Sequence, residues 1–398
     1  METASGAQKE KVKLCLAWTL LLSVVLFFAL FFVPGARQSC IFRYAELCDY
    51  RYFIHPVMNS ASPYAAPSVE LKDACYPAIA YCALKAVAND VGRGWQLAGG
   101  EAALLASLFV AQLLGLLLLA RAIPRTRGRT AAALALAFSS TCICTVLRGN
   151  PSGWAFALVC VFVSWYRSER AVLRTLAAVS LGAATSLKMT PCLFGCLYLS
   201  DAFSSPRRIP WKEIAIAAAS AILLTFLPFG LFGGFCEIRH WLFNALANAD
   251  FYSSHVPMWG FIPFANQFID SKEAVLPSIY LFAAATRVFA VAMVAFALAA
   301  KDDYRRVLYI GAAMAFLTHH DYGGAYLIPA FVVWMCDGDA TTSGVRLLLE
   351  AAAWFLVLTP LQMPCPFFSG TLNAMLQNEC LFVLLAASLF SKAKKETA

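Results

Sequence analysis

The sequence predicts an all-α, polytopic membrane protein with about twelve transmembrane helices, some of them short or broken. Of the 398 residues, 61% are hydrophobic and only 14% are charged, whereas a soluble domain has about 45–50% apolar and about 25% charged residues. Apolar runs also recur along the whole length. We therefore expect one integral-membrane domain over residues 1–398. A soluble enzyme, a disordered regulator and a nucleic-acid-binding domain are all disfavoured.

Twelve apolar segments are the candidate helices. They are Leu14–Val33, Ala102–Ala120, Thr130–Leu147, Trp154–Tyr166, Ala171–Leu187, Pro191–Leu199, Ile214–Phe232, Ala274–Ala299, Val307–Leu317, Ala325–Cys336, Leu347–Leu358 and Met375–Phe390. Several are shorter than the roughly 20 residues that a straight helix needs to cross the bilayer, which indicates broken or re-entrant helices. The first is longer than the apolar core of a typical signal peptide, and we expect an uncleaved anchor.

The basic residues indicate how these segments are oriented. The net charge is +8, and 20 of the 31 Lys and Arg residues follow or precede apolar segments in clusters around residues 9–13, 121–129, 167–174, 207–212, 301–306, 346 and 392–395. If the first cluster is cytoplasmic, all the others fall on the cytoplasmic side of a twelve-pass count, as the positive-inside rule requires. We therefore expect both termini in the cytoplasm, including a short basic tail at 391–398.

Lys188 marks a break between two short helices. It is the only charged residue between Arg174 and Asp201, and a single helix there would place it near the bilayer centre, at a cost of about 2.5–3.5 kcal/mol. Two short helices that meet at Lys188 and Pro191 keep the next basic cluster inside and leave Lys188 in a protein-lined cavity below the outer surface. The alternative is that Lys188 extends to the membrane interface.

The polar candidates for chemistry all fall on the outer side. Outer segments are the first outer loop at 35–101, the turn at 148–153, the long outer loop at 233–272, and residues 319–324 and 362–371. They contain all five histidines and the acidic candidates, namely His55, His240, His255, His319, His320, Glu46, Asp49, Asp73, Asp250 and Asp321. Because nucleotide sugars are cytoplasmic, an enzyme with an outer-face cavity would need a lipid-linked substrate.

The first outer loop carries a recognisable arrangement. Asp49 follows the first span, a Pro-Tyr pair ends at Tyr64, and Tyr76-Pro77 opens a new apolar helix. This order resembles the multi-spanning GT-C glycosyltransferases, and within them the family 87 mannosyl- and arabinofuranosyltransferases that use polyprenyl-phosphate sugars. The resemblance implies a GT-C type of helical fold and a glycosyltransferase in the cell membrane, with its active site facing outside.

The resemblance continues over roughly residues 14 to 335. Arg148-Gly149-Asn150 is similar to the Gly-Gln-x-Asn type of turn in that family, and Lys188-Met189-Thr190-Pro191 is similar to its Lys-x-x-Pro. Residues 244–260 look like its long outer loop, and Thr318-His319-His320-Asp321-Tyr322 resembles its late outer-facing motif. The chain departs from the pattern by lacking the Gln before Asn150 and by having two histidines with an aspartate, which leaves the sugar and the acceptor open.

The resemblance implies that Asp49 is the catalytic carboxylate. Transfer from a polyprenyl-phosphate sugar needs a base that takes the proton of the acceptor hydroxyl, and a single base opposite the leaving group implies inversion. Glu46 is the competing candidate. The structural alternative is that Asp49 only pairs with Arg51 or Arg43 in a solvated loop.

Cations are expected to bind the phosphate of the donor. Lys188 and His320 are the leading candidates, followed by His319, Arg148 and Arg239, because cations stabilise a departing phosphate. The matching motifs add Asn150, Tyr64, Asp321 and His255 as substrate-binding candidates. The adjacent histidines could instead bind a metal with Asp321 or cap a helix, but no H-x-x-x-H or H-E-x-x-H pattern occurs. We expect no metal and no cofactor.

Two other classes of function remain as alternatives. A transporter or lipid flippase for an anionic or lipid-linked substrate would line its path with Lys188 and the histidines, although the polar residues gather on one side. A ligase or polymerase of envelope glycans would use a lipid diphosphate. The expected partners are a polyprenyl-phosphate sugar donor, a glycolipid or glycan acceptor and the lipid bilayer, without nucleic acid.

The sequence leaves open whether a disulfide forms, such as one from Cys40 to Cys48.

Overall fold

The structure is a computed structural model that describes most of the chain. The described residues are 6–31, 47–60, 64, 74–92, 96–204, 209–255, 259, 272–318, 321–337, 344–361 and 372–389. They form helices and connecting turns, with no strand among them. The first part of the first outer loop, most of 256–271 and the tail at 391–398 lie outside this set.

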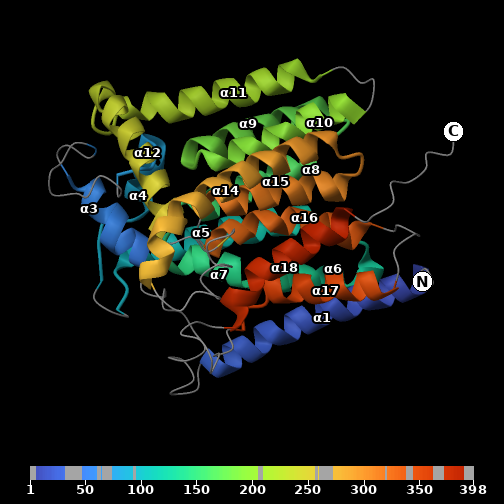
Figure 1. Ribbon diagram of the computed structural model, residues 1–398. Coiled ribbons are helices and arrows are strands. Elements are labelled where there is room, and N and C mark those ends of the chain that lie inside the picture. Colours follow the sequence, from blue (N-terminus) through green and yellow to red (C-terminus); the bar gives the residue numbers. More distant parts are fainter. Residues whose placement is uncertain are drawn as a thin grey trace.

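Thirteen of the described helices form the main bundle, and most of them run in roughly one direction in Figure 1. They are α1 (Gly6–Phe31), α5 (Gly99–Ala120), α6 (Arg129–Ala137), α7 (Ser140–Leu147), α8 (Ser152–Trp165), α9 (Ala171–Leu187), α10 (Cys196–Ser204), α11 (Trp211–Phe226), α14 (Lys272–Ala299), α15 (Asp303–Thr318), α16 (Ile328–Cys336), α17 (Gly344–Leu358) and α18 (Leu372–Leu389). Each of the twelve predicted segments coincides with one or two of these helices.

Shorter elements cover one end of the bundle or join its helices. At one end, Figure 1 shows α3 (His55–Met58), α4 (Ala78–Val87) and α12 (Ile238–His255) close together. The π-helical turn η1 (Asp49–Ile54) leads into α3. The 3-10 turns are η2 (Arg125–Arg127), η3 (Thr190–Gly195), η4 (Leu227–Gly230), η5 (Phe235–Glu237) and η6 (Asp321–Leu327). The helices α4 and α12 fall inside predicted outer loops, and α12 was not predicted.

The bundle has the surface of a membrane protein. Five helical segments are long and apolar enough to cross a bilayer: Gly6–Leu30, Gly99–Ala120, Arg129–Leu147, Trp211–Gly230 and Leu281–Ala299. Large apolar side chains such as Leu22 on α1, Leu223 on α11 and Val288 on α14 are exposed. Soluble monomers rarely expose such extended apolar surface, and it suits contact with lipid. The membrane class is therefore confirmed, whereas the number twelve stays a prediction.

The chain reverses at Lys188, as the sequence predicts. Helix α9 ends at Leu187, and Lys188 adopts an extended backbone conformation before η3, which contains Pro191, begins at Thr190. Lys188 contacts Ser152 at the start of α8, whereas Asp201 on α10 contacts Arg167 just beyond the end of α8. The segment after the break therefore runs back along the length of α8.

The start of α8 is recessed relative to the start of α5. A side chain built on Gly153 would meet Gln112, and one built on Gly115 would meet Ala157, so the two helices run in the same direction in close contact. Gln112 lies 13 residues beyond Gly99, which is about 20 Å along α5 at 1.5 Å per residue. The turn before α8 therefore lies deep beside α5, and other segments fill the space above it.

That space holds a second apolar core. The main core joins the bundle helices. The second packs side chains of residues 47–58, 64 and 74–88 against Leu104 and Leu108 of α5, with Phe229, Phe232 and Trp241 completing it. Because it ties the segment around Asp49 to the first turns of α5, it fixes that segment above α8. We call this end of the bundle, with residues 47–60 and 148–152, the site end.

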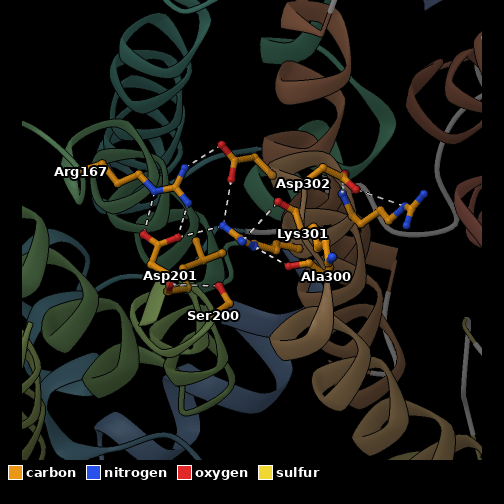
Figure 2. Close-up of polar contacts among 10 residues, drawn as sticks. Arg167, Ser200, Asp201, Ala300, Lys301 and Asp302 are labelled. Carbon is orange, nitrogen blue, oxygen red and sulfur yellow. Dashed lines mark hydrogen bonds and ion pairs between the residues drawn. The ribbon is translucent and has the colours of Figure 1, made fainter. Parts of the chain in front are cut away.

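Ion pairs tie three helices together at the opposite end, which we call the basic end and define by Arg167, Asp201 and Arg306. Figure 2 shows Arg167 and Asp201 there with their partners. The Asp201 carboxylate accepts hydrogen bonds from Arg167 and from Arg306, the latter over 2.9 Å between Nη1 and Oδ1. Asp303 also pairs with both arginines. One carboxylate thus links α8, α10 and α15.

We predict that Asp201→Asn lowers the free energy of unfolding by about 1.5–3 kcal/mol, since hydrogen bonds to charged groups contribute about that much. The matched control is Asp302→Asn. Asp302 pairs with Arg305 at the surface and accepts a hydrogen bond from the Arg305 amide at the start of α15. Asn is about as effective as Asp in capping the start of a helix, so this substitution should cost little. Unfolding of the purified protein in detergent would measure both, and equal losses would contradict the prediction.

Candidate active site

The segment that carries Asp49 is held against the end of α7 by its backbone. The Leu47 amide donates to the Leu147 carbonyl over 3.0 Å, and the Tyr50 amide donates to the Arg148 carbonyl over 3.2 Å. Leu47 itself lies in the left-handed region at φ 51°, which is costly for a residue with a side chain. These contacts place Asp49 directly opposite the turn that joins α7 to α8.

Gly149 makes this close approach possible. Its φ is +68°, and a Cβ atom there would lie 2.8 Å from Tyr50 Cβ and 2.9 Å from Leu47 Cδ2. Only glycine adopts this backbone without strain and leaves room for the two neighbours. The turn consequently presents the side chains on both sides of Gly149, those of Arg148 and Asn150, to the same carboxylate.

Asp49 is a buried carboxylate with a cation on one oxygen and an amide on the other. Arg148 donates to Oδ1 from Nε over 3.0 Å and from Nη2 over 2.6 Å. Asn150 donates from Nδ2 to Oδ2 over 2.6 Å. Burial disfavours the charged guanidinium, but the adjoining carboxylate outweighs that effect, so the pKa of Arg148 lies above its ordinary value. Both groups are therefore charged.

Asn150 connects this pair to two further residues. Its Oδ1 accepts the backbone amide of Ser152 over 2.9 Å, and its Nδ2 also donates to the Tyr76 hydroxyl over 2.9 Å. The side chain is fully buried. Because both ends of the amide are engaged, the orientation of Asn150 is fixed by its partners, and so is the distance from Asp49 to Tyr76.

Lys188 joins the same group from the other side. Its ammonium donates to Ser152 Oγ over 3.0 Å, while the Ser152 backbone amide is the one bound to Asn150. The helix break explains why Lys188 reaches this group, because the end of α9 lies beside the start of α8. Four sequence-predicted residues, Asp49, Arg148, Asn150 and Lys188, are thus brought together by contacts between side chains or through Ser152.

A second buried ion pair holds the Asp49 segment in place. Arg51 donates to both carboxylate oxygens of Glu101, from Nε over 2.6 Å and from Nη2 over 2.8 Å. Glu101 is fully buried in the first turn of α5 and also accepts the Gly92 and Ala98 amides. The alternative that Asp49 pairs with Arg51 in a solvated loop is therefore wrong, since Arg51 is engaged elsewhere and Asp49 is buried. Arg43 lies outside the described residues.

Cys48 next to Asp49 is a free thiol, and so is Cys75. The thiol of Cys48 lies 3.6 Å from Asp49 Oδ1. Burial, together with the nearby Asp49 charge, raises the pKa of Cys48 to about 11. The cysteine is thus a protonated donor toward the carboxylate, and the structure contains no disulfide at Cys48.

The remaining sequence-predicted residues lie elsewhere or outside the described residues. Tyr64 is buried, and its hydroxyl donates to the Tyr76 carbonyl over 3.0 Å, so it supports the backbone of Tyr76. Arg239 is exposed on α12, and in the described part of the chain no hydrogen bond joins it to Asp49 or Lys188. His319, His320 and Glu46, and the side chains of His255 and Asp321, fall outside the described set. Among the described side chains, no group of three could hold a metal ion.

Sequence reasoning missed three residues of this site. Tyr76 was noted only as part of a Tyr-Pro pair, and Ser152 only as part of a turn. Glu101 carries a local signal, since it stands at the third position of α5, where an acidic side chain reaches back to the helix start. Nothing local in the sequence indicates that it would bind an arginine 50 residues earlier.

The fold and the site define a membrane protein with a buried carboxylate beside an arginine and an amide, and with a lysine close by. The model of glycosyltransferase family 87 matches residues 91–319, more than half of the chain, and the chain belongs to that family. It is therefore a membrane glycosyltransferase. The match includes Arg148, Asn150 and Lys188, whereas Asp49 and Tyr76 precede it. Neither a search of curated proteins nor a search of solved structures found a match.

We predict that Gly149→Ala inactivates the site and destabilises the fold. The left-handed backbone alone costs a residue with a side chain about 1–2 kcal/mol, and the contacts with Leu47 and Tyr50 add to that. Gly195→Ala is the control, because a Cβ atom there would have only an ordinary contact with Leu181 at 3.6 Å. Activity per folded molecule and the thermal midpoint measure the two effects. Equal behaviour of the variants would contradict the role of Gly149.

We predict that Glu101→Gln lowers activity per folded molecule, because a neutral amide cannot hold the Arg51 guanidinium with two accepting oxygens. Glu350→Gln is the matched control. Glu350 is also buried and accepts from an arginine, Arg346, and from Trp334, but it lies on α17. Both variants should lose stability, and only Glu101→Gln should lose activity. Similar losses of activity in the two would show that Glu101 has no special relation to Asp49.

Proposed function

We propose that the protein transfers a sugar from a polyprenyl-phosphate donor to a lipid or cell-envelope glycan acceptor on the outer face of the cell membrane. The observation that carries the proposal is the buried Asp49 carboxylate between Arg148 and Asn150, with Lys188 close by. The sugar is mannose or arabinofuranose, by resemblance to the family. The reaction needs neither metal nor cofactor.

Asp49 is the general base in this proposal. It takes the proton of the acceptor hydroxyl while that oxygen forms a bond to the anomeric carbon, and the bond from that carbon to the phosphate oxygen breaks. The reaction inverts the anomeric carbon because one base acts opposite the leaving group. Arg148 and Asn150 hold the carboxylate charged and oriented, which supports this role.

Lys188 and Arg148 bind the donor phosphate, which gains a negative charge as the sugar leaves. Cations placed beside a developing charge in a site of low dielectric stabilise the transition state strongly. His320, His319 and Arg239 are proposed as further phosphate ligands, and Asp321, His255, Tyr64 and Asn150 as residues around the substrate. The support for Lys188 is its position at the helix break, beside the start of α8.

The position of the site relative to the bundle supports access from the outer face. The cluster lies at the site end, and Arg167 and Arg306 lie at the basic end, the opposite end of the bundle. By the positive-inside rule the basic end is cytoplasmic, so both termini are cytoplasmic and the site opens outside. The proposal places the donor headgroup beside the turn before α8 and the break at Lys188, which lie below the start of α5.

We predict that membranes containing the protein transfer label from a polyprenyl-phosphate sugar to an endogenous acceptor without added divalent metal. Asp49→Asn should abolish the transfer with unchanged protein abundance, because an amide cannot take the proton. Full activity of the Asn variant would remove Asp49 as the base. Movement of label across the membrane without a glycosidic product would show that the protein is a transporter and not a glycosyltransferase.

We also predict that Lys188→Ala and His320→Ala raise the KM for the donor more than that for the acceptor. The physical reason is that both side chains act on the donor phosphate. Lys85→Ala serves as a control, since Lys85 is exposed on α4 near the same end. Initial rates at varied donor and acceptor concentrations separate the two effects, and a change confined to the acceptor would contradict the assignment.

A further inference from the structure

The hydrogen bonds around Asn150 determine which way the Tyr76 hydroxyl donates. The Ser152 backbone amide can only donate, so the Asn150 atom that it contacts is the carbonyl oxygen, Oδ1. The other atom is then the amine nitrogen, Nδ2, which has two hydrogens and no lone pair to offer. One hydrogen goes to Asp49 Oδ2 and the other to the Tyr76 oxygen. The Tyr76 oxygen is therefore an acceptor in this contact.

The hydrogen of the Tyr76 hydroxyl must consequently point to something else. A phenol accepts and also donates one hydrogen bond. Within the described part of the chain, no oxygen accepts that hydrogen, and a donor left without a partner inside a protein costs about 1–3 kcal/mol. The side chain is partly buried, and its oxygen is one amide away from the Asp49 carboxylate. A ligand oxygen in the site is a suitable acceptor.

Tyr76 is also held rigidly enough to act as a positioned donor. Its carbonyl accepts the Tyr64 hydroxyl over 3.0 Å, and Pro77 directly precedes α4. Its ring packs edge-on against Tyr81, with 6.1 Å between the ring centroids. The backbone, the ring and the hydroxyl oxygen each have a fixed neighbour, so little reorganisation is needed when a ligand binds.

We propose that the Tyr76 hydroxyl donates a hydrogen bond to a phosphate oxygen of the polyprenyl-phosphate sugar, alongside Lys188 and Arg148. This inference rests on the proposed function. It adds a residue that contacts the donor, comes from the first outer loop and lies outside the stretch matched by the family model.

A phosphate oxygen suits this hydroxyl better than the acceptor hydroxyl does. Arg148 is connected to Asn150 through Asp49, and Lys188 is connected to it through Ser152. The Tyr76 hydroxyl, which is bound to Asn150, therefore lies close to both basic side chains. A hydrogen bond to an anionic oxygen is about twice as strong as one between neutral groups. Donation to the acceptor oxygen would instead withdraw electron density from the nucleophile that Asp49 activates.

The test compares Tyr76→Phe with the unaltered protein. The substitution keeps the ring and removes only the hydroxyl. We expect kcat/KM for the polyprenyl-phosphate sugar to fall by about 10- to 100-fold, the range for one hydrogen bond to a charged group, with the KM for the acceptor unchanged. Inhibition by the sugar-free product, polyprenyl phosphate, should weaken in the same variant, because binding of that product involves no chemistry.

Tyr198→Phe is the control. Tyr198 is likewise a buried tyrosine, but it lies on α10, and Glu213 and Arg174 are the charged groups near it. It should retain normal kinetics. Thermal midpoints of both variants show whether they are folded.

Four outcomes decide the proposal. Weaker use of the donor and weaker product inhibition in folded Tyr76→Phe support it. Normal donor kinetics in Tyr76→Phe, with Asp49→Asn inactive, overturn the role of Tyr76 and leave the proposed function standing. A loss confined to the acceptor also overturns it. If the unaltered protein transfers no label from a polyprenyl-phosphate sugar, the proposed function fails and the inference about Tyr76 fails with it.

Discussion

The structure of the site end depends on one buried carboxylate, that of Asp49. This carboxylate needs partners from a distant part of the chain. Asp49 is 6% exposed, and a charge at that depth is tolerated only when it is paired and hydrogen-bonded. Its partners, Arg148 and Asn150, follow about 100 residues later. The turn that carries them must approach closely, and this requirement explains the left-handed Gly149 and the strained Leu47. Removing one partner would leave an uncompensated charge, so the whole local backbone depends on this contact.

The lengths of the helices decide where that contact lies. Helix α5 has 22 residues and α8 has 14, and the two run in contact in the same direction, so the turn before α8 lies well below the start of α5. The break after α9 occurs at the same level, because Lys188 reaches Ser152. Short helices thus place two polar turns at the same level, beneath the second apolar core, and backbone that is not helical is tolerated at membrane depth only where protein or a cavity surrounds it.

The sequence predicted the helices and part of the site for different reasons. Apolar runs identified each helix of the main bundle because burial in lipid or in protein imposes a strong and continuous pattern. Asp49, Arg148, Asn150 and Lys188 were predicted from their order along the chain and their resemblance to a family, and the structure brings them together. The pairing of Asp49 with Arg51 was a local alternative, and it fails because side chains two residues apart on a helical turn diverge.

Other residues could not be found in this way. Tyr76 enters the site through a hydrogen bond with Asn150, and Ser152 through hydrogen bonds with Asn150 and Lys188. Such contacts leave no periodic pattern in the sequence. Helix α12 has polar residues such as Asn244, Asn248 and Asp250 interleaved with its apolar ones, so it was interpreted as loop. These are cases in which packing against the rest of the protein, rather than local preference, decides the structure.

The charges of the described site residues stay balanced through the proposed reaction. In the proposed donor complex, Arg148 and a Lys188 protonated beside the phosphate carry two positive charges, while Asp49 and the phosphodiester of the donor carry one negative charge each. After transfer, Asp49 has taken a proton and is neutral, and the released phosphate monoester, as the dianion, carries two negative charges. The sum is zero in both states. Uncompensated charge is expensive in surroundings of low dielectric. A site with one carboxylate and two cations therefore moves the negative charge from the base to the leaving group without any ion having to enter or leave the site.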